Sequence, residues 1–270
     1  MQHSSPQSHF QQLQGKRIIV TGAARGIGAG TVRAFVRAGA QVAALDINAE
    51  GGRAATAEAN AQGEGSATFY PCDIANPEQV FAVFAEAERA MGGLDVLAHI
   101  AAIEEACPAE EFTLNDMNRT WGININGTVL TNQAACKLMQ KQGKGAIINF
   151  ASDVALSGMP NSALYAASKG AVLSWTRTIA YEWALKFNIR CNCINPTIKT
   201  PMYEAWLANL TDEQRQAHLA NEKRQVPLGG AMGDIDKDMA PVMVFMASDA
   251  SGFINGQIVP VNGGRNMLRG

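Results

Sequence analysis

The chain has 270 residues, of which 47% are hydrophobic and 17% charged, and this size and composition predict one large globular domain. A formal net charge of −2 indicates no basic surface for nucleic acid or for an anionic membrane. No apolar run approaches the roughly 18 residues that a membrane-spanning helix requires. Five cysteines are too sparse for a disulfide framework in a chain of this length, which favours the cytoplasm.

Two local patterns set limits on the domain. Residues 1–14 are polar and rich in Gln, Ser and His, which predicts a flexible tail without the apolar stretch of a secretory signal. Cys191 and Cys193 stand in an apolar run, and no second ligand pair accompanies them at zinc-site spacing. We therefore expect a buried strand there and no metal site.

From residue 15 to 270, short apolar runs alternate with longer helical patterns, as in a parallel sheet with crossover helices. The strand candidates are Lys16–Thr21, Gln41–Asp46, Ala67–Cys72, Leu94–Ile100, Gly145–Ala151, Ile189–Ile194 and Gln257–Val261. The helix candidates are Ile27–Ala38, Ala49–Asn60, Pro77–Met91, Asp116–Gln140, Ser162–Lys186 and Asp234–Ala247. The sequence predicts a single α/β domain, a doubly wound, Rossmann-type, seven-stranded parallel sheet with helices on both faces.

Residues 200–227 interrupt this alternation after the sixth strand. They predict two helices, Met202–Leu210 and Asp212–Arg224, on the carboxyl side of the sheet where ligands bind in such folds. A helical excursion of this length predicts a lid over the substrate. A simple surface or interface helix pair is the alternative.

A glycine-rich turn joins the first strand to the first helix. Gly22, Gly26 and Gly28 give the spacing G-x-x-x-G-x-G, and Arg25 and Ile27 lie within the same turn. Glycines at this place permit a tight turn and a close approach of the backbone to a pyrophosphate at the helix N-terminus. The pattern predicts a dinucleotide site.

An acidic residue that closes the second strand bears on which dinucleotide binds. Asp46 can accept hydrogen bonds from the adenosine ribose, and its charge would repel a 2′-phosphate, which favours NAD over NADP. Arg25 is the opposing observation, because a cation there can receive that phosphate. Asp73, after the third strand, is placed either to meet the adenine or to cap its own turn.

Tyr165 and Lys169 are four residues apart in a helical pattern, and Ser152 lies thirteen residues before the tyrosine. Residues at i and i+4 share one helix face, so the phenol and the ammonium can point into one site. An ammonium beside a phenol lowers the phenol's pKa, and we therefore expect a proton-transfer group near neutral pH.

With these residues assembled, the chain resembles the short-chain dehydrogenase/reductase family from about Gly15 to Gly264. The residues that match the family's motifs are Gly22, Gly26, Gly28, Asp73, Ile74, Asn124, Ser152, Tyr165 and Lys169, with the segment Pro196–Thr200 near the nicotinamide. The resemblance implies cofactor contacts also from Arg25, Ile27, Asp46, Ala101, Thr197, Ile198 and Thr200. It also implies a homotetramer built on the long helices around residues 117–140 and 163–186.

The resemblance further implies a mechanism. Tyr165 would exchange a proton with the substrate oxygen while hydride moves to or from the nicotinamide. Lys169 would lower the pKa of the tyrosine and hold the nicotinamide ribose. Ser152 would hydrogen-bond the substrate oxygen, and Asn124 would position a water that carries protons onward.

Two departures from the family pattern stand near the cofactor. Where Asn-Asn-Ala-Gly is usual, the chain reads His99-Ile100-Ala101-Ala102, and we expect His99 to brace neighbouring strands as a buried structural residue. Ala102 would narrow the space beside the cofactor. Thr197 replaces a glycine after Pro196 and would shift backbone contacts to the nicotinamide.

The sequence describes the substrate less closely. The pocket candidates flank the motif residues: Ile103, Glu104, Asp153, Val154, Leu156, Met159, Met202 and Trp206. Glu104 and Asp153 disfavour an anionic substrate, although either acid can face solvent, so we expect a neutral, cyclic or hydroxylated secondary alcohol or ketone and NAD. The alternatives are an NADPH-dependent 3-oxoacyl thioester reductase and a dinucleotide-binding sensor or scaffold with reduced catalysis.

Overall fold

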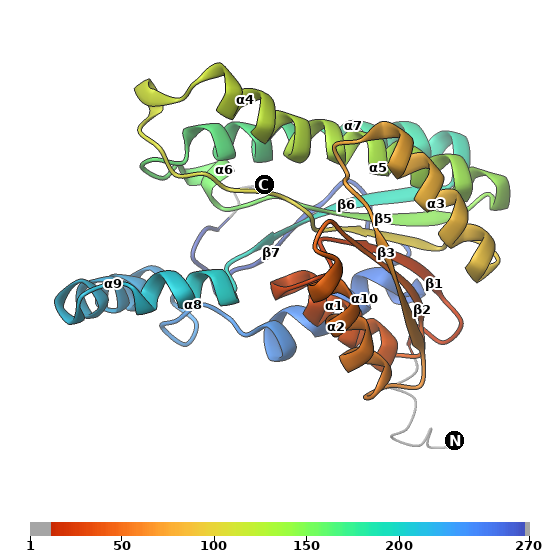
Figure 1. The fold of residues 1–270 in the computed structure, drawn as a ribbon, viewed down its shortest axis with the longest axis horizontal. Coiled ribbons are helices and arrows are strands. Elements are labelled where there is room, and N and C mark those ends of the chain that lie inside the picture. Colours follow the sequence, from red (N-terminus) through yellow and green to blue (C-terminus); the bar gives the residue numbers. More distant parts are fainter. Residues whose placement is uncertain (1–11, 268–270) are drawn as a thin grey trace.

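The computed structural model describes residues 12–267, and a parallel sheet of seven strands forms its centre (Figure 1). The strand order is β3-β2-β1-β4-β5-β6-β7, so the chain winds outward in both directions from β1 and β4. The strands are β1 Arg17–Thr21, β2 Gln41–Asp46, β3 Ser66–Pro71, β4 Val96–His99, β5 Gly145–Phe150, β6 Ile189–Pro196 and β7 Ile258–Val261. The predicted fold class is confirmed.

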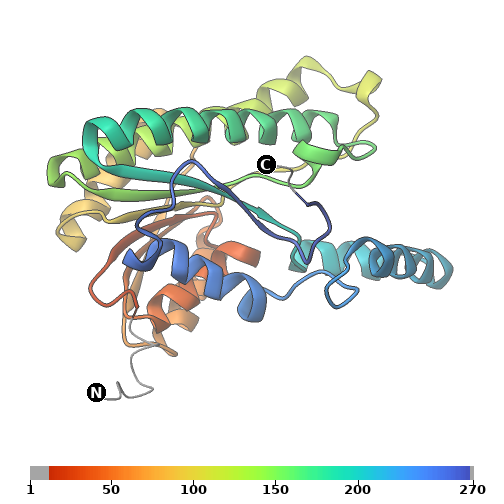
Figure 2. The same cartoon turned by 180° about the vertical axis from the view of Figure 1, so that it is seen from behind.

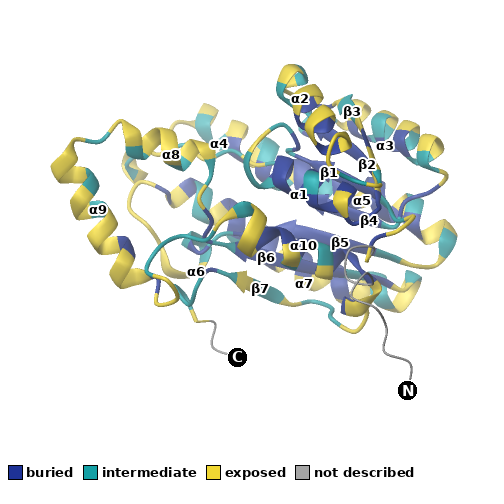
Figure 3. Ribbon diagram, turned by 90° about the horizontal axis from the view of Figure 1, so that it is seen from below, coloured by how far each residue is buried: buried dark blue, intermediate teal, exposed yellow. Residues whose placement is uncertain are grey.

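Helices form a layer on each side of the sheet (Figures 1 and 2). The helices α1 Gly26–Arg37, α2 Ala49–Asn60 and α10 Ala240–Ala247 cover one face, and α3 Pro77–Met91, α5 Gly127–Met139 and α7 Ala163–Phe187 cover the other. Alternate residues of β1 serve the two cores, because Ile18 and Val20 pack on the α1 side and Ile19 on the α5 side. The inner strands β1, β4, β5 and β6 are accordingly buried on both faces (Figure 3).

Two predicted helices are interrupted by π turns. The run predicted as Asp116–Gln140 consists of α4 Leu114–Trp121, a π turn η3 Gly122–Asn126, α5 and a short 3₁₀ turn η4 Gln140–Gln142. The run predicted as Asp234–Ala247 begins with a π turn η5 Ile235–Met239 before α10. Pro241 lacks the N–H that an α-helix would need there, which accounts for the second interruption.

Short elements and the ends complete the chain. These are η2 Ala109–Glu111, α6 Val154–Ser157 and η6 Asp249–Ser251. Residues 1–11 of the predicted tail lie outside the described residues. Leu13, however, is fully buried and its N–H donates to the Ala38 carbonyl (3.0 Å), so the packed structure begins earlier than the predicted residue 15.

Cys191 and Cys193 are buried in β6, as expected. Among residues 12–267, no helix is long and apolar enough to cross a bilayer.

The excursion after β6 forms two helices that project from the body of the molecule (Figure 1). They are α8 Pro201–Ala208 and α9 Asp212–Gln225, close to the predicted limits, and α9 is largely exposed (Figure 3). The buried carboxylate of Glu222 in α9 accepts hydrogen bonds from the Tyr203 hydroxyl and from the Met232 N–H (2.9 Å). This contact joins α8, α9 and the following loop into one unit.

Candidate active site

The glycine turn after β1 adopts a backbone that only glycine accepts readily. Gly22 and Gly26 have φ values of 69° and 57°, in the left-handed region. A Cβ placed on Gly28 would lie 1.9 Å from the Gly22 carbonyl oxygen, and one on Gly22 would lie 2.8 Å from the Ala101 Cα. The turn is therefore packed against itself and against the segment that follows β4.

The N-terminus of α1 at this turn has the properties of an anion site. No side chain caps it, and its first turn contains no acidic residue. By contrast, the Asn48 side chain caps α2 by accepting from the Gly51 N–H (3.0 Å). Uncapped N–H groups at a helix N-terminus attract phosphate, so these residues fit a dinucleotide pyrophosphate.

Asp46 ends β2 directly beside the glycine turn. Its Oδ2 accepts from the Ala24 N–H (3.0 Å) and its Oδ1 from the Asn48 N–H (2.8 Å), which fixes the carboxylate between the turn and α2. Arg25 precedes α1 and is exposed. Asp73 accepts from the Ala75 N–H (2.9 Å) within its own turn, so its capping role is present in the structure.

The segment Pro196–Thr200 lies opposite the glycine turn. A Cβ placed on Gly26 would lie 3.9 Å from Thr200, whose own hydroxyl caps α8 by accepting from the Tyr203 N–H (3.3 Å). Thr197 and Ala102, which replace glycines of the family pattern, do not have positive φ values. Both substitutions are thus accommodated without backbone strain.

Thr197 forms a hydrogen bond with Asp153, the residue that follows Ser152. Asp153 is buried, and its Oδ2 accepts from the Thr197 hydroxyl (2.6 Å), while its Oδ1 accepts from the side-chain amides of Asn195 (2.5 Å) and Asn262 (3.3 Å). The expectations that Asp153 lines the substrate pocket or faces solvent are therefore wrong. Its carboxylate instead joins the ends of β5, β6 and β7 behind Ser152.

Tyr165 and Lys169 occupy successive turns of α7, with the Lys169 Nζ 5.7 Å from the centre of the tyrosine ring. Burial raises the pKa of the Tyr165 phenol above its usual value, and the Glu104 carboxylate raises it further, while a hydrogen bond with Ser152 lowers it. The expectation that Lys169 lowers this pKa is not met in this arrangement.

Lys169 is itself buried, and burial lowers the pKa of its ammonium to about 8, although Cys193 and Glu104 oppose this shift. Its Nζ donates to the Phe150 carbonyl (2.9 Å) at the end of β5. This contact holds the lysine between α7 and the strand that precedes Ser152.

Asn124 lies in the π turn and is almost fully buried. Its side chain accepts from the Ile103 N–H (2.9 Å) and donates to the Ile103 carbonyl (2.8 Å) and to the Ser168 hydroxyl (3.0 Å). Both N–H donors of the amide are thus used in bracing the segment after β4 against α7.

His99 is the buried structural residue that the sequence predicts. Its Nδ1 lies 3.0 Å from the hydroxyls of both Thr21 and Thr131, and its Nε2 lies 3.0 Å from the Thr128 hydroxyl. Burial and, second, the nearby Lys169 lower its pKa to about 3, so the ring is neutral. It links β1, β4 and α5, and Thr128 in turn donates to the Asn124 carbonyl (2.7 Å).

The structure thus brings most of the predicted residues to the carboxyl edge of the sheet, where the loops after β1, β2, β4, β5 and β6 meet. Of the remaining pocket candidates, Ile103 and Val154 are half-buried, and Leu156, Met159, Met202 and Trp206 are exposed. Ile74 and Ile198 are buried. Sequence reasoning missed Asn195 and Asn262, because nothing in the local sequence links them to Asp153.

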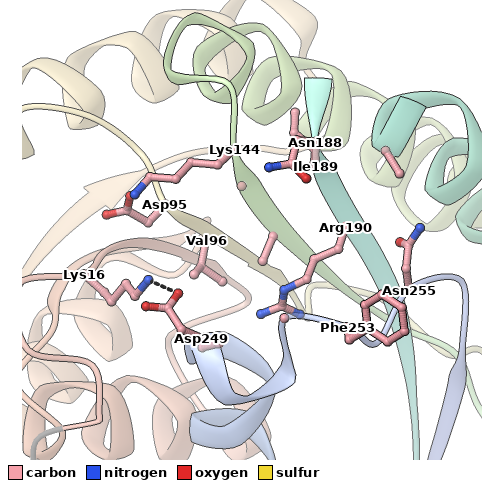
Figure 4. A pocket seen from close by; sticks show the side chains of 15 residues that line it. Lys16, Asp95, Val96, Lys144, Asn188, Ile189, Arg190, Asp249, Phe253 and Asn255 are labelled. Carbon is pink, nitrogen blue, oxygen red and sulfur yellow. Dashed lines mark hydrogen bonds and ion pairs between the residues drawn. The ribbon is translucent and has the colours of Figure 1, made fainter. Parts of the chain in front are cut away.

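A cavity of about 520 Å³ lies at the opposite edge of the sheet (Figure 4). It is lined by residues at the beginnings of strands, among them Lys16, Val96 and Ile189, and by the Lys16–Asp249 ion pair (2.6 Å). Since the glycine turn and Tyr165 follow strand ends, this cavity is separate from the candidate active site.

Comparisons with known proteins agree with this geometry. A family model described as enoyl-(acyl carrier protein) reductase matches residues 22–266. D-threitol dehydrogenase of Mycolicibacterium smegmatis is 36% identical over 94% of this chain and 94% of its own length. The chain therefore belongs to the short-chain dehydrogenase/reductase family. It is an oxidoreductase of the alcohol dehydrogenase class.

Two further relatives bear on the cofactor and the reaction. The 3-oxoacyl-[acyl-carrier-protein] reductase FabG of Thermotoga maritima is 33% identical over 94% of this chain and 98% of its own. A crystal structure described as an NAD(P)-dependent gluconate 5-dehydrogenase from Beutenbergia cavernae, with NADP bound at low occupancy, superposes with a TM-score of 0.84. It is 32% identical and covers 95% of this chain and 98% of its own.

Proposed function

We propose that the protein is an NAD(H)-dependent oxidoreductase that interconverts a neutral, hydroxylated secondary alcohol and its ketone, with Tyr165 as the general acid and base. The observation that carries this proposal is the arrangement of Tyr165 with Ser152 and the buried Lys169 at the carboxyl edge of the sheet. The uncapped glycine turn on the same edge supplies a place for the dinucleotide.

The proposed roles follow from what each side chain contacts. Ser152 lies near enough to the Tyr165 phenol to lower its pKa, so the two hydroxyls can meet one substrate oxygen. Tyr165 donates its proton to that oxygen in ketone reduction and receives it in alcohol oxidation. A bound nicotinamide would supply or accept the hydride. Lys169, fixed by the Phe150 carbonyl, presents a buried ammonium next to the phenol.

NAD is the proposed cofactor because of Asp46. Its carboxylate is held by the backbone of the glycine turn, so its charge lies where a 2′-phosphate would approach. Arg25 at the start of α1 favours NADP instead. We give Asp46 more weight because its position is fixed by two hydrogen bonds, whereas Arg25 is exposed.

The proposed substrate is small to medium in size and uncharged. The D-threitol dehydrogenase relative supports a polyhydroxylated compound. Glu104 disfavours an anion, whereas the exposed ammonium of Lys199, three residues after Pro196, would favour one. We propose further that α8 and α9 act as a lid, that the protein is a homotetramer through α5 and α7, and that it works in the cytoplasm.

An NADPH-dependent 3-oxoacyl thioester reductase is the second candidate, which the similarity to the Thermotoga maritima reductase favours. Asp46 opposes it. The support for a sensor with reduced catalysis is the departure at His99-Ile100-Ala101-Ala102. The hydrogen bonds of His99 and the ordinary backbone angle of Ala102 weigh against this candidate.

The experiment that tests the proposal is steady-state reduction of NAD⁺ with neutral polyols, comparing the wild type with Tyr165→Phe. We expect the variant to bind NADH as the wild type does and to lose turnover by orders of magnitude. Near-normal turnover of Tyr165→Phe would contradict the proposed acid and base. Reduction of 3-oxoacyl thioesters with NADPH, without oxidation of polyols, would favour the second candidate.

A further inference from the structure

Glu104 is an acidic residue that two independent contacts hold at the candidate active site. Its neighbour Ile103 is fixed at both its N–H and its carbonyl by the Asn124 side chain (2.9 and 2.8 Å). Its own Oε1 accepts from the hydroxyl of Ser162 (3.3 Å), a buried residue at the start of α7, three residues before Tyr165. The carboxylate is therefore positioned from both sides.

The charge of Glu104 acts on both proton-handling groups of the site. It raises the pKa of the Tyr165 phenol and opposes the fall in the pKa of Lys169. A carboxylate beside a phenol disfavours the phenolate that alcohol oxidation requires. Alcohol oxidation by Tyr165 therefore gains nothing from the charge of Glu104.

Glu104 also retains an oxygen for a ligand. The side chain is exposed, and Ser162 is the hydrogen-bond donor that meets it within residues 12–267, at Oε1. An ionised carboxylate is an acceptor only, and it binds hydroxyl donors well. The Ser162 contact, three residues before Tyr165, and the effect of its charge on the Tyr165 phenol place the carboxylate near the proton-transfer group, and its Oε2 accepts no hydrogen bond within residues 12–267.

We propose that Glu104 is a specificity-determining residue that accepts a hydrogen bond from a second substrate hydroxyl, so that the site selects neutral vicinal diols and polyols over simple alcohols. This inference rests on the proposed function, because it names the substrate class of the same site. It assigns to Glu104 substrate recognition, and to Tyr165 the proton transfer.

The test compares alcohols that carry a hydroxyl next to the reacting carbinol with analogues that lack it: 1,2-cyclohexanediol with cyclohexanol, 2,3-butanediol with 2-butanol, and threitol with 1,3-butanediol. The kcat/KM for NAD⁺ reduction is measured for the wild type, Glu104→Gln and Glu104→Ala. The control variant is Glu110→Gln, which removes the same charge from an exposed position in the same segment.

We expect the wild type to prefer the diol of each pair it oxidises. Glu104→Ala should lower kcat/KM for the diol by about 10- to 100-fold, mainly through KM, which is the range for one hydrogen bond to a charged group. Cyclohexanol and 2-butanol should change by less than about threefold, and Glu110→Gln should behave as the wild type. Glu104→Gln, which keeps an acceptor oxygen, should fall between the wild type and Glu104→Ala.

A second readout reports on the position of Glu104 independently of the diol. Without its charge the pKa of Tyr165 falls, so the rise of alcohol oxidation with pH should move to lower pH in Glu104→Gln and not in Glu110→Gln. An unchanged diol preference in Glu104→Ala overturns the inference while leaving the proposed function intact. If the wild type oxidises none of the six alcohols, both the substrate class and the role of Glu104 are rejected.

Discussion

The neutral, buried His99 predicts a specific dependence of stability on pH. Its pKa is lowered from 6.5 to about 3 in the folded protein because the ring is buried among three threonine hydroxyls, with Lys169 adding repulsion. In the unfolded chain the ring regains its ordinary pKa. The unfolded state therefore binds one more proton than the folded state as the pH falls below about 6.5.

The loss of stability on acidification follows from this difference between the folded and unfolded pKa of His99. A group whose folded pKa is depressed contributes stability that is present above the unfolded pKa and is lost as the pH falls toward the folded value. Each pH unit within the window from about 6.5 to 3 then costs about 1.4 kcal/mol, so lowering the pH from 7.5 to 5 should cost about 2 kcal/mol. This is an appreciable part of the stability of a domain.

The assay is urea unfolding at fixed protein concentration between pH 5 and 7.5, comparing the wild type with His99→Asn. Asparagine does not titrate and keeps both a donor and an acceptor for the threonine hydroxyls. His218, which remains in both proteins, contributes equally to each. The variant should be less stable at pH 7.5 but should lose about 2 kcal/mol less on acidification. Equal pH dependence of the two proteins would refute the account of His99.

Three further predictions follow from the site. In a double-mutant cycle of Thr197→Val and Asp153→Asn, unfolding free energies should show a coupling of about 1 kcal/mol or more, and additive effects would contradict the shared hydrogen bond. Because burial and Glu104 raise the pKa of Tyr165, kcat/KM for alcohol oxidation should rise steadily from pH 7 to pH 9.5, whereas a plateau below pH 7 would contradict that shift. If α8 and α9 form a lid, limited proteolysis between residues 200 and 227 should slow when cofactor and a substrate alcohol are both present, and unchanged cleavage would count against a lid.

The sequence predicted the sheet and most helices to within a few residues because buried parallel strands are almost continuous in apolar residues. It failed where structure depends on partners distant in the chain. Leu13 was assigned to the tail because one apolar residue among glutamines gives no periodic signal, although it is buried against the end of α1. The π turn at Gly122–Asn126 also escaped prediction, since one additional residue per turn hardly disturbs a helical pattern.

The candidate site was also predicted only in part from the sequence. The glycine turn, Tyr165 and Lys169 are recognisable because their spacing follows from local geometry. The partnership of Asp153 with Thr197 spans 44 residues, and neither residue has a local signal for it. The pKa of Tyr165 was predicted in the wrong direction, because helix spacing brings Lys169 near but does not reveal the burial of the phenol or the charge of Glu104.

In the proposed function, this chain binds NAD(H) at the glycine turn, and Asp46 selects against a 2′-phosphate. The most direct measurement is titration of the purified protein with NADH and with NADPH, following nucleotide fluorescence, for the wild type and for Asp46→Asn. The wild type should bind NADH more tightly, and Asp46→Asn should reduce or abolish that preference by improving NADPH binding. Tighter binding of NADPH by the wild type, or binding of neither nucleotide, would contradict the account.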